Sequence, residues 1–491
     1  MPTDAAPEIL PRLTLRVGDV LSRLREIPSG SVQCVITSPP YWGLRDYGIA
    51  PVVWAPVRYA PLPGLPEFSV PDRPVSRDFL SCTHHWEMWT ESHDVRETPI
   101  CGKTRTTERC YGGAASRKFD GNHQKHRHGQ FCVQCGAWRG CLGHEPSPDL
   151  YIGHLVQVFR EIRRVLRPDG TLWLNLGDSY SGSGKGMNPS DSPHQKQARN
   201  RGSVRNTGKV DAGTGMKQML GIPWRAALAL QADGWTLRSD IVWAKGASFA
   251  RTWHGNPMPE SVRDRPSRAH ETIFLLSPSP RYFYDHVAVQ EPAAQPHSRA
   301  PRQGDDRRPI LRNLRDVWAI TTKPFKGAHF ATFPPDLVEP MIRAGTPQAG
   351  RCPRCGAPWR RETRRGSPVY TGGASRAVTQ AREHASLSRQ GVNGALSTGV
   401  HYLRETLGWR PGCACPEHDP VPADVLDPFF GAGTTGLVAL ALGRSALGIE
   451  ANPEYAALAL ARIGAAVPGG RKTRVAPGPS AQERATGEAG A

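Results

Sequence analysis

Four residues near the start of the chain combine hydrogen-bond acceptors with a rigid backbone: Ser38-Pro39-Pro40-Tyr41. They follow an apolar run, 32–36, that predicts a buried strand. Two successive prolines fix φ and remove two backbone donors, so side chains and carbonyls here are available as acceptors. An exocyclic amine of a nucleobase would suit them, with Ser38 Oγ and the Pro39 carbonyl accepting its protons and Tyr41 stacking on the base. The alternative is a proline turn that closes a strand.

A second chemically suggestive stretch lies near the other end of the chain. Residues 425–427 predict a strand, 428–436 a glycine turn and 437–442 a helix, which is the pattern of a nucleotide-binding βα corner. Glu450, at the end of the next predicted strand (446–450), is placed to accept from ribose hydroxyls. The spacing Gly431-x-Gly433-x-x-Gly436 alone also suits a dinucleotide, whereas the preceding Asp427-Pro428-Phe429 does not.

Together these stretches resemble the amino-group DNA methyltransferases of the β-type order, in which the catalytic motif precedes the S-adenosyl-L-methionine motif. Residues 174–180, 240–245, 257–265 and 329–334 are similar to further segments of that family, in its order. The resemblance implies catalysis at Ser38, Pro39, Pro40 and Tyr41. It implies cofactor contacts at Asp19, Asp427, Pro428, Phe429, Gly431, Gly433, Thr434, Thr435, Glu450, Asn452, His329 and Phe330. For Asp19, a helix N-cap is the competing interpretation.

Eight metal-binding candidates form two sets with zinc-knuckle-like spacing. The first is Cys82 and His84 with Cys132 and Cys135, where His85 competes with His84; the second is Cys352, Cys355, Cys413 and Cys415. In each set a Cys-x-x-Cys-Gly turn can direct backbone amides toward thiolates. The alternative is buried free thiols. Four protein ligands leave zinc no open position, so both sites would be structural.

Composition limits the classes of function. A formal charge of +18 and a pI near 9.7 indicate a polyanionic partner, here double-stranded DNA. The sequence contains no apolar run long enough to span a membrane and no secretory signal pattern, so we expect a cytoplasmic protein with reduced thiols. A cognate restriction endonuclease is a candidate partner of a protein with this resemblance.

The elements that would position these residues alternate between strand and helix. Residues 13–19 predict a strand, 20–26 a helix, 151–166 a helix, 171–176 a strand, 223–233 a helix, and 235–245, 271–276 and 282–284 strands. We therefore expect a doubly wound, mainly parallel α/β sheet with an antiparallel edge, carrying zinc-binding insertions. Ligands of such sheets lie at the carboxyl ends of strands, so the two motifs can share one crevice.

The expected division of the chain follows the same pattern. Residues 12–46 would carry the catalytic loop, 47–148 an insertion with a possible zinc site, and 149–345 the methyltransferase core with DNA-binding loops at 181–217 and 290–309. Residues 346–420 would form a zinc-ribbon-like insertion, 421–466 the cofactor-binding part, and 467–491 a disordered tail.

The expected reaction is direct displacement of the methyl group by a base amine that has left the duplex stack. A carbon-5 cytosine methyltransferase would need a thiolate, usually from Pro-Cys, which this sequence lacks. Ser-Pro-Pro-Tyr, in the family it resembles, is associated mainly with the N4 amine of cytosine, and the N6 amine of adenine is the alternative. A NAD-dependent oxidoreductase and a non-catalytic zinc DNA-binding protein are the more distant alternatives.

Overall fold

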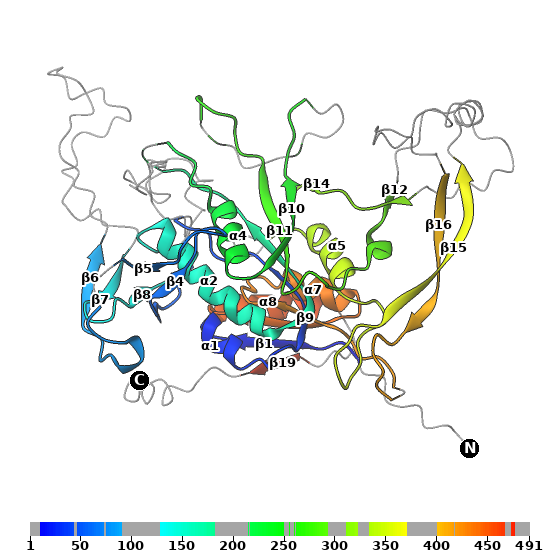
Figure 1. Ribbon diagram of the computed structural model, residues 1–491, viewed down its shortest axis with the longest axis horizontal. Helices are drawn as coiled ribbons and strands as arrows, with labels where there is room; N and C mark the ends of the chain where they lie inside the picture. The colour runs from blue at the N-terminus through cyan, green and yellow to red at the C-terminus, as the bar shows by residue number, and fades with distance from the viewer. Residues whose placement is uncertain are drawn as a thin grey trace.

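The computed structural model describes residues 10–43, 47–72, 75–90, 128–181, 215, 217–249, 255, 260, 262–292, 311–322, 333–370, 400–416, 418–466 and 473–476. Its centre is a nine-stranded sheet in the order β14-β10-β11-β9-β2-β17-β18-β1-β19 (Figure 1). The strands are β1 (Leu13–Val17), β2 (Val32–Thr37), β9 (Leu166–Leu176), β10 (Thr236–Ala244), β11 (His270–Ser277), β14 (Val317–Ala319), β17 (Asp424–Asp427), β18 (Ser445–Glu450) and β19 (Thr473–Ala476).

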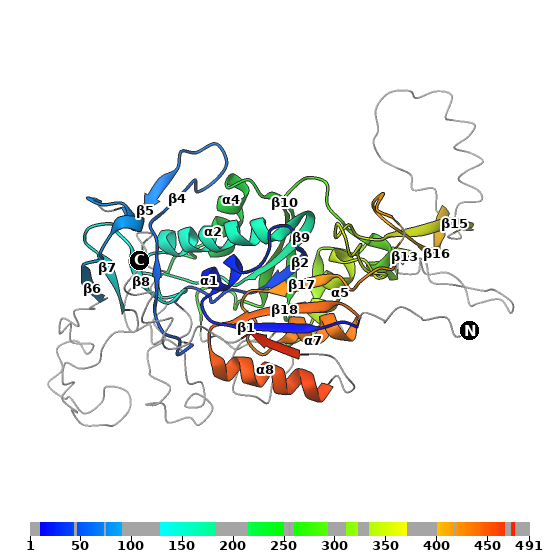
Figure 2. The ribbon, with the colours of Figure 1, turned by 90° about the horizontal axis from the view of Figure 1, so that it is seen from below.

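Helices cover both faces of this sheet, as the two views in Figures 1 and 2 show. One layer packs into a core with α1, α2 and α4, and the opposite layer packs into a second core with α5, α7 and α8. The helices are α1 (Val20–Arg25), α2 (Pro148–Val165), α4 (Ile222–Ala232), α5 (Pro335–Gly345), α7 (Thr434–Ala441) and α8 (Pro453–Ala466). Two short 3-10 helices are η1 (Phe79–Ser81) and η3 (His286–Val289).

The sequence of the central strands explains this double packing. In β9, Leu172, Leu174 and Leu176 belong to the first core and Trp173 to the second. Because successive side chains of a strand point to opposite faces, a strand with apolar residues on both faces must be covered on both sides. β2, buried along its whole length, follows the same rule. The mixed α/β fold with a mainly parallel sheet therefore agrees with the sequence-based prediction.

The antiparallel part of the sheet differs from the prediction in its position. β11 is antiparallel to both β10 and β9, and it lies third from one edge rather than at the edge; the edge strand β14 is parallel to β10. Within the residues that the structure describes, no helix connects β10 to β11, so the chain returns as a hairpin, which yields antiparallel pairing.

Two local predictions were wrong. Residues 282–284 are irregular rather than a strand, because Phe283 N–H donates to the Asp169 carbonyl and the segment passes directly into η3. The predicted disordered tail contains β19, which pairs with β1 in parallel and adds an edge strand to the sheet. Backbone hydrogen bonding to the open edge of β1 explains why this strand forms. It was not predicted because four residues are too few to show an apolar pattern.

Smaller sheets lie outside the main one. Residues 47–148 contribute a four-stranded sheet, β3-β8-β7-β6, and the pair β4-β5; residues 346–420 contribute the long hairpin β15-β16; and β12 pairs with β13. The bounds are β3 (Val52–Trp54), β4 (Val57–Tyr59), β5 (Phe68–Val70), β6 (Trp86–Thr90), β7 (His128–Cys132), β8 (Trp138–Gly140), β12 (Glu291–Pro292), β13 (Leu311–Arg312), β15 (Arg360–Tyr370) and β16 (Val400–Arg410). Across the described ranges, every helix is too short or too polar to cross a membrane.

Candidate active site

The loop that follows β2 ends in a half-buried polar network. Tyr41 Oη lies 2.8 Å from Glu271 Oε2, and Asn175 Nδ2 donates to both atoms at 2.9 and 2.8 Å. Lys245 Nζ forms an ion pair with the other Glu271 oxygen. Ser38 Oγ lies 3.2 Å from Tyr41 Oη. The network therefore joins the loop to β9, β10 and β11.

Charge fixes the protonation of this network. Burial raises the pKa of Tyr41 well above its usual value, and the Glu271 carboxylate raises it further. Burial alone would raise the pKa of Glu271, but Lys245, with hydrogen bonds from Asn175 and Tyr41, lowers it instead. Glu271 is thus an ionised carboxylate that only accepts, and Tyr41 is a neutral phenol that donates to it.

This order sets the direction of the next hydrogen bond. Because the Tyr41 proton is used by Glu271, the phenolic oxygen accepts from Ser38, and the Ser38 hydroxyl proton points toward Tyr41. Ser38 Oγ then offers lone pairs to an incoming donor. The Tyr41 hydroxyl cannot reverse the chain while Glu271 stays ionised. A hydroxyl oriented in this way is an acceptor for an N–H group.

The ring of Tyr41 is held as closely as its hydroxyl. A Cβ at Gly177 would lie 2.6 Å from Tyr41 Cε2, so glycine at that position leaves room for the ring. Tyr151 Oη donates to the Pro40 carbonyl at 2.8 Å. Among the described residues, no hydrogen bond is made to the Pro39 carbonyl, which is the second predicted acceptor for the amine.

A buried carboxylate joins the loop that follows β2 to the glycine turn. Thr37 Oγ1, in the last residue of β2, donates to Asp427 Oδ1 at 2.8 Å, and Thr435 Oγ1, in the first turn of α7, donates to Asp427 Oδ2 at 2.8 Å. Phe429 N–H adds a third bond at 3.1 Å. The structure therefore brings together two stretches that are about 390 residues apart in sequence.

Burial controls the ionisation of both acidic groups in the turn. Asp427 is 2 % exposed, and burial raises its pKa to about 7 although Thr435, Thr37 and Phe429 N–H oppose the shift. Burial likewise raises the pKa of Glu450, against hydrogen bonds from backbone N–H groups. The hydrogen bonds of Asp427 all go to protein groups. It would therefore affect a cofactor indirectly, by holding the glycine turn in place.

The glycine turn itself is ordered around Glu450. Its carboxylate accepts from Gly431 N–H at 2.7 Å and from Asn452 N–H at 2.8 Å. Gly431 and Gly433 have φ values of 50° and 72°, a region that favours glycine. At Gly436 a Cβ would lie 2.6 Å from Phe430 Cζ, so this glycine makes room for a core phenylalanine rather than for a ligand.

The other predicted cofactor contacts occupy varied positions. Asp19 caps α1 by accepting from Ser22 N–H, which is the alternative interpretation of that residue. Asn452 Oδ1 accepts from Glu454 N–H, and Thr434 Oγ1 accepts from Arg462. Pro428 is buried and Phe429 half-buried beside them. His329 and Phe330 lie outside the described residues, as do most of the predicted DNA-binding loops.

A narrow gap between side chains, without room for a water molecule, lies beside both motifs. Side chains from the end of β2, from β9 and from α5 line this gap. It therefore lies between the hydrogen bonds of Asp427 and those of Tyr41. Its lining is Ile36, Thr37, Trp173, Asn175, Phe333, Leu337, Val338 and Met341.

A second, buried network contacts Trp42 in the loop that follows β2. No sequence pattern had indicated it. His154 Nδ1 lies 2.9 Å from Glu145 Oε1, and the His154 ring stacks on Trp54 and Trp138 at centroid distances of 4.6 and 5.4 Å. The Glu145 carbonyl accepts from Trp42 Nε1 at 2.9 Å. The four-stranded sheet is therefore coupled to the residue that follows Tyr41.

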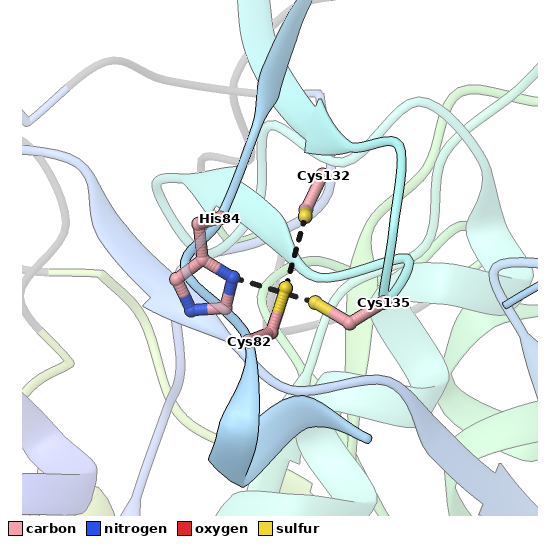
Figure 3. A group of neighbouring side chains, drawn as sticks. All are labelled: Cys82, His84, Cys132 and Cys135. Atoms are coloured by element: carbon pink, nitrogen blue, oxygen red, sulfur yellow. Dashed lines mark hydrogen bonds between the residues drawn. The ribbon is translucent and has the colours of Figure 1, made fainter. Parts of the chain in front are cut away.

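The first set of metal-binding candidates is brought together at one end of the four-stranded sheet, as Figure 3 shows. Cys82 Sγ lies 3.6 Å from Cys132 Sγ, and Cys135 Sγ lies 3.4 Å from His84 Nδ1. With Zn–S near 2.3 Å and Zn–N near 2.0 Å, the edges of a tetrahedron are about 3.5–3.8 Å. The donor set and its spacing therefore fit zinc.

The second set is brought together at the base of the β15-β16 hairpin. All four thiol sulfurs lie within 4.8 Å of one another. Cys352 N–H donates to Ala357 and Gly356 N–H to Cys352, which repeats the bonds of Cys132 N–H to Ala137 and Gly136 N–H to Cys132. Two turns with the same hydrogen bonding and a convergent Cys-x-x-Cys pair suit the same metal.

Sequence reasoning missed Glu271 and Lys245 as members of the site. Lys245 follows the carboxyl end of β10, where ligands of parallel sheets are expected. Glu271 stands near the start of β11, and because β11 is antiparallel its amino end lies at the same edge. The available signal was a charged residue directly after β10 and another near the start of β11.

Comparisons with known proteins cover most of the chain. The sequence profile of a family described as DNA methylase matches residues 32–351 and 423–461. The type II methyltransferase M.XycI of Xanthomonas campestris pv. cyanopsidis is 33 % identical over 457 residues, covering 93 % of this chain and 89 % of the relative. M.Cfr9I of Citrobacter freundii is 31 % identical, with coverage of 92 % and 87 %.

Two solved structures have a similar but more distant arrangement. The cytosine-N4-specific PvuII DNA methyltransferase is 14 % identical with a TM-score of 0.41, covering 93 % of this chain and 90 % of its own. A putative DNA modification methylase of Thermus thermophilus, solved with S-adenosyl-L-methionine, is 17 % identical with a TM-score of 0.39, covering 95 % and 99 %.

Proposed function

This chain belongs to the DNA methylase family as a β-type amino-group methyltransferase, and from that premise we propose that it methylates the N4 amine of cytosine in double-stranded DNA. S-adenosyl-L-methionine is the methyl donor of this reaction. The transfer would be a direct displacement in which the amine nitrogen takes the methyl group from the sulfonium, the sulfur leaves as a neutral thioether, and the proton released by the amine passes to water. Positioning and electrostatics provide the rate enhancement.

The observation that carries the proposal is the pair of hydrogen bonds through which Asp427 joins the two motifs. It holds the end of β2 and the start of α7 on one buried carboxylate, so a nucleotide-like cofactor at the glycine turn would lie next to Ser38. Glu450, Gly431 and Gly433 form the turn that would receive its ribose and methionine portions. When the cofactor is bound it supplies the electrophilic methyl group.

The protein's own residues prepare the amine. Glu271 and Tyr41 orient Ser38 Oγ as an acceptor, and the Pro39 carbonyl provides a second acceptor in the same loop. Two N–H···O bonds favour a more pyramidal nitrogen, whose lone pair is then less delocalised into the ring and more nucleophilic. The target cytosine must leave the stack to reach them, and Tyr41 would stack on it.

The choice of cytosine rests on Ser38 ahead of the proline pair, because the family resemblance associates a serine there mainly with the N4 amine. Adenine N6 is the alternative under the same mechanism. The test is to methylate DNA with purified enzyme and labelled cofactor, digest it, and identify the nucleoside by mass. N4-methylcytosine is expected, and N6-methyladenine as the sole product would refute the base assignment.

We also propose that the two cysteine sets hold structural zinc within insertions at 47–148 and 346–420. Both sets would bind the ion fully with protein ligands, and neither takes part in methyl transfer. The similarity to type II methyltransferases supports a role beside a restriction endonuclease of the same specificity. Protection of DNA methylated by this enzyme against such a nuclease would test that pairing.

A further inference from the structure

We propose that the β15-β16 hairpin is an arm that contacts the phosphates of double-stranded DNA. The inference rests on the proposed function for its partner and adds where that partner is held. The described parts of the two strands, 360–366 and 404–410, carry six arginines against two glutamates: Arg360, Arg361, Arg364, Arg365, Arg404 and Arg410 against Glu362 and Glu405.

Two cross-strand pairs of the hairpin bring like charges together, whereas Arg364 lies opposite Glu405 and pairs with it at 2.7 Å. Arg360 lies directly opposite Arg410, and Arg365 directly opposite Arg404. Like charges opposite each other destabilise a pair of strands. Arg410 is partly offset by Glu362 at 3.5 Å, with both side chains at least half exposed, and ion pairs so exposed contribute little. A polyanion that neutralises these two opposed arginine pairs would explain why the hairpin carries them.

One arginine of the hairpin serves a different purpose and fixes the arm to the body. Arg361 forms bidentate hydrogen bonds with the buried Asp285 at 2.8 to 3.2 Å and stacks on Trp409 with 4.2 Å to the ring centroid. Arg351 pairs with Asp424 of β17 at 2.6 Å. The arm is therefore anchored at its base, and its other arginines are presented in a defined direction.

The second cysteine set strengthens the same base. Cys355 precedes β15 by five residues, Cys413 follows β16 by three, and the Cys355 carbonyl accepts from Arg167 of β9 at 2.8 Å. The four thiols thus close the two strands where they leave the body. A closed base allows two strands of eleven residues each to extend from the body as a rigid ribbon.

The arm has the dimensions and direction that a DNA contact requires. Eleven residues of strand extend about 35 Å, and the major groove admits a two-stranded ribbon. Figure 1 shows the hairpin standing apart from the sheet beside β12 and α5 and running in the general direction of β10 and β14. The carboxyl ends of those strands, where Lys245 contributes to the site, lie on the side toward which β15 runs.

The experiment measures how DNA affinity depends on salt. Unmodified duplex DNA is titrated at low and at near-physiological salt with the full chain, with Arg365→Gln/Arg404→Gln, and with Arg360→Gln/Arg410→Gln. Each lost phosphate contact lowers the slope of log K against log[salt] by about 0.9, so each pair should lower it by about 1.8. The dissociation constant should rise on the order of 10-fold, irrespective of DNA sequence.

The controls separate position from charge. Arg25→Gln/Arg343→Gln removes two positive charges from α1 and α5, and should leave the slope unchanged. Arg365→Lys/Arg404→Lys keeps the charge and should keep the slope. Circular dichroism and calorimetric cofactor binding report whether each variant is folded. An unchanged slope in both arm variants would overturn the proposal, and so would an equal decrease in the control pair.

The two proposals fail in different ways. If the unaltered chain binds DNA but produces no methylated nucleoside, the methyltransferase proposal fails and the salt slopes still test the arm. If it methylates DNA and the arm variants keep the full slope, the arm proposal fails alone.

Discussion

Replacing Glu271 with glutamine should disable the site by reversing a hydrogen-bond chain. Lys245 forms an ion pair with one oxygen of Glu271, so in the variant the amide oxygen faces Lys245 and the amide NH₂ faces Tyr41. Tyr41 would then accept from the amide and donate to Ser38, whose own proton would turn toward the substrate amine. Two donors would face each other where an acceptor is required.

The magnitude follows from that contact and from the one to Asn175 Nδ2, which donates to Glu271 Oε2 and would face the amide NH₂ of the variant. A hydrogen bond lost in this way, with a buried group left unpaired, costs about 1–3 kcal/mol. Each 1.36 kcal/mol is about tenfold in rate, so kcat should fall about 10- to 100-fold. Cofactor affinity should not change, because within the described residues the hydrogen bonds of Glu271 go to Tyr41, Asn175 and Lys245 and not to Asp427 or the glycine turn.

The assay compares steady-state methyl transfer from labelled S-adenosyl-L-methionine with calorimetric binding of the same cofactor. Glu161→Gln is the matched control, since it removes a carboxylate that pairs with Arg164 on α2, away from the site. Tyr41→Phe provides the second arm of a double-mutant cycle. If Glu271 acts through Tyr41, the double variant should be no slower than the slower single variant.

Additive losses in kcat would refute the relay, because they would mean that Glu271 acts independently of Tyr41. A Glu271→Gln enzyme with unchanged kcat would refute it as well. The pH profile gives a separate check. Because the pKa of Glu271 is lowered, its carboxylate stays ionised at pH 6, and protonation of Glu271 should cause no loss of activity near that pH.

Further outcomes are expected from three other changes. Tyr41→Ala should abolish methylation while S-adenosyl-L-methionine still binds by calorimetry, and retained activity would contradict the assignment of the loop. Metal analysis should find about two zinc ions per chain, and Cys352→Ser/Cys355→Ser should lower that number by about one and reduce the melting temperature; folded, active, metal-free protein would exclude structural zinc. Folded Asp427 has a pKa of about 7 against an ordinary 3.8, so it binds a proton that the unfolded chain releases, and the resulting stabilisation is present at low pH and lost as pH rises through about 7. Relative to Asp427→Asn, the wild type should therefore gain up to about 3 kcal/mol on going from pH 8 to pH 5, measured by denaturant unfolding, and parallel pH curves would refute that assignment.

The parts of the fold that could be predicted are those written in short-range patterns. Strands such as 32–37 are mostly apolar, and helix 148–165 repeats its apolar residues with the helical period. The Cys-x-x-Cys-Gly spacing paired the right cysteines because the turn itself brings two sulfurs together. The position of β11 could not be predicted, since pairing partners of a strand depend on the whole sheet.

The site was predictable to a similar extent. Ser38 and Asp427 stand in motifs whose residue types indicate their chemistry, whereas Glu271 is a lone acidic residue near the start of an otherwise mostly apolar strand. Its role depends on β11 being antiparallel, which brings its amino end beside Tyr41 and Asn175. The buried pair of Glu145 and His154 could not be predicted for the same reason. His154 stacks on Trp54 and Trp138, which belong to the separate four-stranded sheet.

The hydrogen bond between Thr37 and Asp427 also has a consequence for how the chain is made. At about 5–20 residues per second, the roughly 390 residues between them take about 20 to 80 s to synthesise. Until β17 emerges, β2 has one unpaired edge, and every residue of that strand is buried in the finished sheet. Such an edge is a template for pairing with other chains. The nascent protein therefore spends most of its synthesis with an edge of its central strand open to pairing with other chains.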